Sequence, residues 1–251
     1  MRKPFLAGNW KMNLDRRSGV ALARTLAARS VTWSGREVAI FPAFVYLDEI
    51  VRATAGSGVR VGAQNLCDEK SGAFTGEVSA AMLKDVGATL VLCGHSERRH
   101  LYGEDDRLVN RKLHAALSQG LDVILCVGET LEERKSGSTE ARLSRQMTLG
   151  LAGVSAEDLA RITIAYEPVW AIGTGVNASP AQAGEAHTYL RGLLSGLYGE
   201  SAAAAVRIQY GGSVKADNIQ TLMRAPNVDG ALVGGASLQS ESFLGIVEVA
   251  L

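Results

Sequence analysis

Eight short apolar runs recur along the chain, and this repetition constrains its fold more than any other feature. The runs begin at Phe5, Val38, Val59, Thr89, Asp122, Ile162, Val206 and Gly230. Their spacing of about 20–45 residues suits strand–helix units of roughly 30 residues. Most runs are rich in Val, Ile or Leu and do not alternate with polar residues, which is typical of strands covered on both faces. The runs therefore predict eight strands of a parallel sheet.

Helical patterns separate these runs. Ser179-Pro-Ala-Gln182 predicts a helix start, because Ser can cap, Pro fits the first turn and Gln can reach back. We expect helices over Arg16–Arg29, Val45–Ala55, Asp105–Ser118, Leu131–Leu151, Ala181–Leu197 and Lys215–Arg224. The alternation fits either a closed barrel or an open doubly wound sheet, and periodicity does not distinguish them. No linker or charge run marks a boundary, so we expect residues 1–251 to form a single domain.

Composition narrows the classes of function. Lys plus Arg equals Asp plus Glu at 26 each, so the chain lacks the positive field of a general nucleic-acid binder. No stretch approaches the ~20 apolar residues of a membrane span, and Gly8 and Lys11 interrupt the N-terminal run, which argues against a secretory segment. The three cysteines have no CxxC spacing, and Cys93 and Cys126 lie inside apolar runs. This pattern favours buried thiols in a reducing, cytoplasmic compartment.

Polar residues that directly follow the runs are the candidates for chemistry, because ligands of parallel α/β folds bind at the carboxyl ends of the strands. Asn9 and Lys11 follow the first run, His95 and Glu97 the fourth, and Glu167 the sixth. A carboxylate, an imidazole and an ammonium group on one rim suit proton transfer on a phosphorylated substrate. Taken singly, Lys11 could instead be a solvated charge at a strand end, and Asn9 could be an ordinary turn residue. Glu167 directly ends an apolar strand, where a plain surface carboxylate is less expected.

Glycine-rich turns follow the last two runs, as Gly211-Gly212-Ser213 and Gly234-Gly235. Backbone N–H groups bind phosphate well, and glycine lets the backbone approach closely. Each turn taken alone is equally consistent with an ordinary strand–helix connection. The stretch from Gly173 to Ala178 fits the dinucleotide pattern G-x-G-x-x-A only weakly, because it does not directly follow a strand.

The sequence does not predict a metal site. Cys93 and His95 are two residues apart, but no third ligand stands at a sensible spacing, and zinc sites need at least three protein ligands. The remaining histidines, His100, His114 and His187, lie in loop or helical contexts. We expect these three side chains to face solvent or to cap helices.

A set of motifs in order from Gly8 to Leu238 resembles the triosephosphate isomerase family. The motifs are Gly8-Asn-Trp-Lys-Met-Asn13, Gln64-Asn65 with Gly72-Ala-Phe-Thr-Gly76, Gly94-His-Ser-Glu-Arg-Arg99, Cys126-Val-Gly-Glu-Thr130, Ala165-Tyr-Glu-Pro-Val-Trp-Ala-Ile-Gly-Thr-Gly175, Tyr210-Gly-Gly-Ser213 and Leu232-Val-Gly-Gly-Ala-Ser-Leu238. The resemblance implies a closed (β/α)8 TIM barrel. It also implies an isomerase of glycolysis and gluconeogenesis that interconverts dihydroxyacetone phosphate and D-glyceraldehyde 3-phosphate through an enediolate, with no metal or organic cofactor.

The resemblance also implies roles for the rim residues. Glu167 would be the general base, and His95 would polarise the carbonyl and move protons between the two oxygens. Lys11 and Asn9 would support the negative charge of the enediolate. Glu97 would lie near Lys11, or would simply be a favourable charge at a helix start. Triosephosphate isomerases pair a glutamate base with a neutral histidine at a helix N-terminus, and a helix beginning just after His95 would fit that arrangement.

The segment after Glu167 resembles the mobile lid of the family, which would exclude water from the reaction. Its residues are Pro168, Val169, Trp170, Ala171, Ile172, Gly173, Thr174 and Gly175. Backbone N–H groups of Gly173, Ser213, Gly234 and Gly235 would bind the phosphate, together with Asn9 and Lys11. Val176-Asn177 departs from the Lys common in the family after Gly175, which leaves the second hinge open to question.

Residues 65–79 form a long connection between two units, and such connections are usually functional or disordered. In the family this loop inserts into the partner of a homodimer, which would bring Phe74 and Thr75 to the partner, Thr75 close to its active site. A flexible surface loop is the alternative, and Cys67-Asp68 replaces the aromatic-Pro pair often found there. Two rival functions have less support. Another barrel enzyme such as an aldolase would need a lysine inside a strand, and no internal strand position supplies one. A catalytically silent phosphate-binding barrel would be signalled by loss of Glu167 or His95, and both are present.

Overall fold

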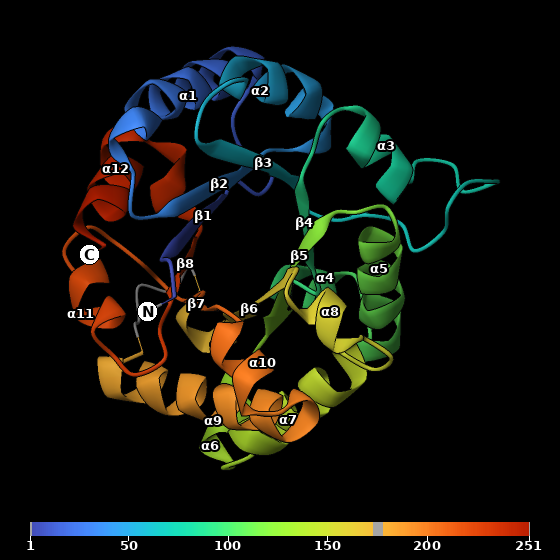
Figure 1. The fold of residues 1–251 in the computed structure, drawn as a ribbon, viewed down its shortest axis with the longest axis vertical. Coiled ribbons are helices and arrows are strands. Elements are labelled where there is room, and N and C mark those ends of the chain that lie inside the picture. Colours follow the sequence, from blue (N-terminus) through green and yellow to red (C-terminus); the bar gives the residue numbers. More distant parts are fainter. Residues whose placement is uncertain (1, 173–177, 251) are drawn as a thin grey trace.

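The eight predicted strands close into one parallel barrel in the computed structural model, which describes residues 2–172 and 178–250 (Figure 1). Neighbours along the chain pair in register, and the first strand also pairs with the last, with Phe5 opposite Gly230. Closure therefore excludes the open sheet. The strands are β1 Phe5–Asn9, β2 Glu37–Phe41, β3 Val59–Ala63, β4 Leu90–Cys93, β5 Asp122–Val127, β6 Ile162–Tyr166, β7 Ile208–Tyr210 and β8 Gly230–Val233.

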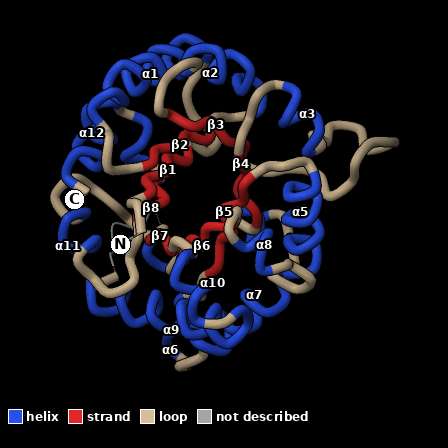
Figure 2. Tube along the Cα trace, viewed as in Figure 1, coloured by secondary structure: helices blue, strands red, loops and turns tan. Residues whose placement is uncertain are grey.

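Helices surround the barrel and cover the outer face of its strands (Figure 2). The α-helices are α1 Arg16–Arg29, α2 Leu47–Thr54, α3 Ala80–Asp85, α4 Ser96–Leu101, α5 Asp106–Ser118, α6 Leu131–Lys135, α7 Thr139–Gly150, α8 Ala156–Leu159, α9 Pro180–Tyr198, α10 Glu200–Ala205, α11 Ile219–Met223 and α12 Ser240–Val249. Short 3-10 helices span Ser30–Thr32, Phe44–Tyr46, Val169–Ala171 and Gly235–Leu238. Within the described ranges, no helix combines the length and the apolar character needed to cross a bilayer.

Two of the predicted helices are wrong in extent. The helix expected over Leu131–Leu151 is two helices, because Gly137 has φ +73° between α6 and α7. The helix expected over Lys215–Arg224 is the shorter α11. The predicted start of α9 is confirmed, since the Ser179 hydroxyl accepts from the Gln182 N–H and the Gln182 side chain accepts from the Ser179 N–H.

Two apolar layers explain why the strands do not alternate. One layer lies between the strands and the helices, and a second fills the barrel interior. The interior residues are Phe5, Ala7, Ala39, Phe41, Leu90, Leu92, Ile124, Cys126, Ala165 and Leu232. Burying each large apolar side chain stabilises the fold by about 1.5–3 kcal/mol. The filled interior closes the barrel below its carboxyl rim, and Leu232 also lines the pocket above it.

His187 does not face solvent, so that expectation is wrong. His187 is a residue of α9 with no exposed surface, and its Nδ1 is 3.1 Å from the carbonyl oxygen of Asn227. The ring packs edge-on against Tyr166, with ring centroids 5.8 Å apart. Burial lowers the pKa of His187 to about 4 and so favours the neutral imidazole. His100 is exposed as expected, and the partly buried His114 contacts the carbonyl oxygen of Ala152.

Candidate active site

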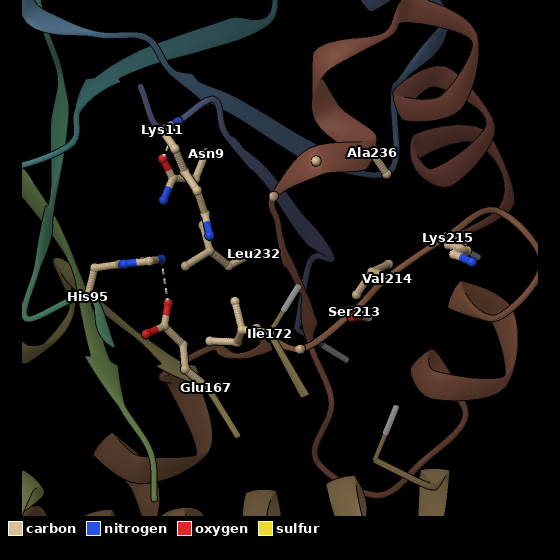
Figure 3. Close-up of a pocket in the computed structure, with 14 residues that line it drawn as sticks. Asn9, Lys11, His95, Glu167, Ile172, Ser213, Val214, Lys215, Leu232 and Ala236 are labelled. Carbon is tan, nitrogen blue, oxygen red and sulfur yellow. Dashed lines mark hydrogen bonds and ion pairs between the residues drawn. The ribbon is translucent and has the colours of Figure 1, made fainter. Parts of the chain in front are cut away.

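A pocket of about 280 Å³ lies at the carboxyl ends of the strands (Figure 3). It brings together side chains from widely separated parts of the chain, as the polar residues after each apolar run predicted. The pocket is lined by Asn9, Lys11, His95, Glu167, Ile172, Gly211, Gly212, Ser213, Val214, Lys215, Leu232, Gly234, Gly235 and Ala236. The side chains capable of proton transfer adjoin the glycine-rich turns, since Gly211 lies against Glu167 and Gly234 against Lys11.

Glu167 follows β6 directly, and only 2% of its surface is exposed. Its Oε1 lies 3.2 Å from His95 Nε2, and its Oε2 accepts a hydrogen bond of 2.8 Å from the Ser96 N–H. The Glu167 backbone N–H donates to the carbonyl of Val127 at 2.7 Å. A Cβ at Gly211 would lie 2.8 Å from Glu167 Cγ, so a larger residue at position 211 would clash with the Glu167 side chain. Hydrogen bonds therefore fix both the backbone and the carboxylate oxygens of Glu167.

His95 is the N-cap of α4, and it is 6% exposed. Its Nδ1 accepts a hydrogen bond of 3.2 Å from the Glu97 N–H, so Nδ1 carries a lone pair. In the neutral ring the proton then sits on Nε2, the atom that faces Glu167. Because α4 begins at Ser96, the predicted helix start beside the ring is confirmed. The arrangement aims an N–H donor into the pocket.

Lys11 projects toward the same space from the end of β1. Its Nζ is 2.5 Å from Glu97 Oε1, which is the neighbouring carboxylate that the sequence suggested. Lys11 has φ +51°, a conformation uncommon outside glycine, and its N–H donates to Asn9 Oδ1 at 3.0 Å. Gln64 Nε2 donates to the Lys11 carbonyl at 2.7 Å. Gln64 and Ser96 were not among the predicted site residues, and only the fold reveals their contacts.

The glycine-rich turns line another part of the pocket wall, largely with backbone. Gly234 faces Lys11, since a Cβ there would lie 3.9 Å from Lys11 Nζ. Gly212 has no room for a side chain, because a Cβ would lie 2.2 Å from Tyr210 Oη. Ser213 turns its hydroxyl to the carbonyl of Ala171 at 2.7 Å, which links this wall to the segment after β6. The backbone N–H groups of these turns and the nearby ammonium suit an anion.

The sequence of the whole chain matches one family. Residues 4–250 match the family described as Triosephosphate isomerase. The chain belongs to the triosephosphate isomerase family. It is 53% identical over 248 residues to the triosephosphate isomerase of Carboxydothermus hydrogenoformans, covering 99% of each chain. It is 50% identical over 247 residues to the enzyme of Herpetosiphon aurantiacus, covering 98% of this chain and 99% of that one. The resemblance drawn from the motifs is thereby confirmed.

The structure describes the first part of the expected lid, from Pro168 to Ile172. Val169–Ala171 forms a 3-10 helix, and Trp170 Nε1 donates to Glu129 Oε1 at 2.9 Å. Glu129 is fully buried, and its Oε1 also accepts from the Tyr166 hydroxyl at 3.0 Å. Sequence reasoning missed Glu129, although it lies in one of the family motifs. Gly173, Thr174 and Gly175, and the departure at Val176-Asn177, lie outside the described residues.

The connection between β3 and α3, for which the resemblance implied a role in a dimer, extends away from the barrel (Figure 1). Phe74 is 44% exposed and Thr75 is exposed, and neither lines the pocket of its own chain. Arg111 Nε on α5 is 2.7 Å from Asp68 Oδ2 at the base of this loop. Among residues 2–172 and 178–250, His, Cys, Asp and Glu side chains do not form a group of three or more that could hold a metal ion.

Proposed function

We propose that this chain interconverts dihydroxyacetone phosphate and D-glyceraldehyde 3-phosphate by proton transfer through an enediolate. The observation that carries the proposal is the 3.2 Å separation between Glu167 Oε1 and His95 Nε2 inside one pocket. A base and an N–H donor that face the same small space can act on adjacent atoms of one substrate. Membership of the triosephosphate isomerase family supports the identity of that substrate.

In the proposed reaction, the Glu167 carboxylate takes a proton from the hydroxyl-bearing carbon beside the carbonyl. The electron pair left behind forms a carbon–carbon double bond, and negative charge develops on the carbonyl oxygen. His95 Nε2–H donates to that oxygen and then moves protons between the two oxygens. Glu167 returns its proton to the former carbonyl carbon, which gives the aldehyde. No atoms or electrons are gained or lost.

Lys11 and the glycine-rich turns would balance the negative charges of the enediolate and of the phosphate. The Lys11 ammonium and the Asn9 side chain line the same pocket as Glu167 and His95, where preorganised charges and dipoles would stabilise the developing negative charge. Backbone N–H groups of Ser213, Gly234 and Gly235 would bind the phosphate. The backbone N–H of Gly173, from the lid, is proposed to bind it as well. The bound phosphate would orient the three-carbon chain between Glu167 and His95.

A dehydrogenase-coupled assay on purified, EDTA-treated protein tests this function. We expect turnover of both substrates without added metal or organic cofactor. Absence of turnover would contradict the proposal. Binding of inorganic phosphate without turnover would instead favour the catalytically silent phosphate-binding barrel.

We also propose that the chain forms a homodimer, in which the loop carrying Phe74 and Thr75 inserts into the partner and Thr75 approaches its active site. Membership of the triosephosphate isomerase family supports this, together with large apolar side chains that the single chain leaves exposed. Besides Phe74 they include Met12, Val45, Met82 and Leu101. Light scattering on the purified chain should give twice the monomer mass of 26.5 kDa. A monomer at micromolar concentration would contradict the proposal.

We propose that residues 1–251 act as one domain in the cytoplasm and serve glycolysis and gluconeogenesis. The three free, buried cysteines support a reducing compartment. Fractionation of the source cells with activity measured in each fraction tests the location.

A further inference from the structure

Gln146 is a buried polar residue on an otherwise apolar face of α7. It is 3% exposed, and its buried neighbours on the helix include Leu143, Met147 and Gly150. A leucine would continue this face, and burying an amide is unfavourable unless it is hydrogen-bonded. Gln146 Oε1 accepts a buried hydrogen bond of 2.7 Å from the Gly128 N–H, just after β5. Gln146 therefore has a specific polar contact with the backbone at the rim of the barrel.

That contact joins Gln146 to Glu167 through a single peptide group. The N–H of the peptide between Val127 and Gly128 donates to Gln146 Oε1, and the C=O of the same peptide accepts from the Glu167 N–H at 2.7 Å. A peptide group is planar, so holding its N–H also sets the direction of its C=O. Hydrogen bonds in such a chain also polarise and strengthen one another.

The backbones of Gly128 and Glu167 are in direct contact as well. A Cβ at Gly128 would lie 1.7 Å from the Glu167 carbonyl oxygen, which is far closer than any side chain permits. The same two segments are also joined at Glu129, the residue after Gly128, whose carbonyl accepts a hydrogen bond of 3.1 Å from the Val169 N–H. Movement of the peptide at Gly128 is therefore transmitted to the backbone that carries the catalytic carboxylate.

We propose that Gln146 is a positioning residue for Glu167, acting through the peptide between Val127 and Gly128. The inference rests on the proposed role of Glu167 as the base. Gln146 does not line the pocket, so it acts only through the backbone. Loss of its acceptor frees this peptide to rotate and shifts Glu167. Proton transfer is sensitive to such shifts, since a misplacement of about 1 Å can cost about 10²-fold in rate.

The test compares Gln146→Leu, which has similar volume and no acceptor, with Gln146→Glu, which keeps an acceptor oxygen in place. Gln209→Leu is the matched control. Gln209 is also a fully buried glutamine with a hydrogen bond to backbone, from its Nε2 to the Phe5 carbonyl at 2.9 Å, and it does not line the pocket. Thermal unfolding reports the purely structural cost of each change. Kinetics are measured on the folded fraction.

We expect kcat of Gln146→Leu to fall by about tenfold or more, while KM and inhibition by inorganic phosphate change by less than about twofold. A substrate deuterated at the carbon that loses its proton should show a larger isotope effect on kcat, because proton transfer becomes slower. Gln146→Glu should recover most of kcat. Gln209→Leu should lose stability and keep its kcat.

A wild-type kcat in Gln146→Leu, or an equal loss of kcat in Gln209→Leu, would overturn the inference. If Gln146→Leu does not fold, Gln146→Asn takes its place under the same criteria, because its oxygen falls short of Gly128 by about one bond length. Absence of turnover in the wild-type chain would instead overturn the proposed function. The two failures are therefore distinguished by the wild-type measurement.

Discussion

The carboxylate of Glu167 and the imidazole of His95 face each other at 3.2 Å, although the two residues are 72 positions apart in the sequence. Each group is oriented by the start of the same helix, because Ser96 N–H donates to Glu167 and Glu97 N–H donates to His95. The first turn of α4 therefore organises both partners of the proposed proton transfer.

Glu167→Asp should fold normally and lose much of its activity. The shorter side chain withdraws the carboxylate from the pocket by about one bond length, which spoils the geometry of proton transfer. We expect kcat to fall on the order of 10²-fold, measured in the coupled assay, with little change in circular dichroism. Glu157→Asp, which shortens an exposed carboxylate on α8, is the control. Near-normal turnover of Glu167→Asp would remove Glu167 from the role of base.

Lys11→Met should remove the ammonium group that lines the pocket together with His95 and Glu167. We expect kcat/KM to fall by about 10²-fold or more, because a preorganised charge beside a developing anion is lost. The dependence of kcat/KM on ionic strength should also weaken. Lys135→Met makes the same change of charge on exposed α6, and its kinetics should match the wild type. Equal kinetics in both variants would mean that Lys11 is a solvated charge.

The buried His187 should make the folded state sensitive to acid. Its pKa is about 4 in the fold and about 6.5 when unfolded, so the unfolded chain binds more protons between these values. Stability is therefore retained above about pH 6.5 and is lost as the pH falls toward 4. From pH 7 to 4.5 this group alone should cost on the order of 2 kcal/mol. Burial causes the shift, and nearby Asp229 and Arg191 act on it in opposite directions.

Urea unfolding of the wild type and of His187→Gln at several pH values checks this prediction. The variant should lose less stability than the wild type on acidification. His100→Gln changes an exposed histidine and should behave like the wild type. Parallel pH profiles for wild type and His187→Gln would contradict the assignment.

Cys93 and Cys126 should resist alkylation in the native protein. Burial raises the pKa of Cys93 to about 12, and burial followed by the nearby Glu167 carboxylate raises the pKa of Cys126. Only the thiolate reacts readily, so iodoacetamide at about pH 8 should leave both thiols unmodified. Mass spectrometry should find both modified after denaturation. Rapid native alkylation of Cys126 would indicate that the barrel interior opens.

Local patterns predicted most of the secondary structure because they depend on neighbouring residues. Unbroken apolar runs predicted the strands, and the cap at Ser179 predicted the start of α9. The break between α6 and α7 was missed, although Ser136-Gly137-Ser138 is a local signal for a turn. The rule that polar residues after the strands share a rim correctly grouped Asn9, Lys11, His95 and Glu167, which do share one pocket.

The sequence by itself determined the eight strand–helix units, the polar residues that end the strands and, through its motifs, the family. Only the tertiary structure decided which groups meet across the barrel. Gln146 against Gly128, Ser96 against Glu167 and the enclosure of His187 each join segments separated along the chain. The physical reason is that burial and hydrogen-bond partners are set by how the closed barrel brings distant residues together. No local pattern of apolar and polar residues contains that information.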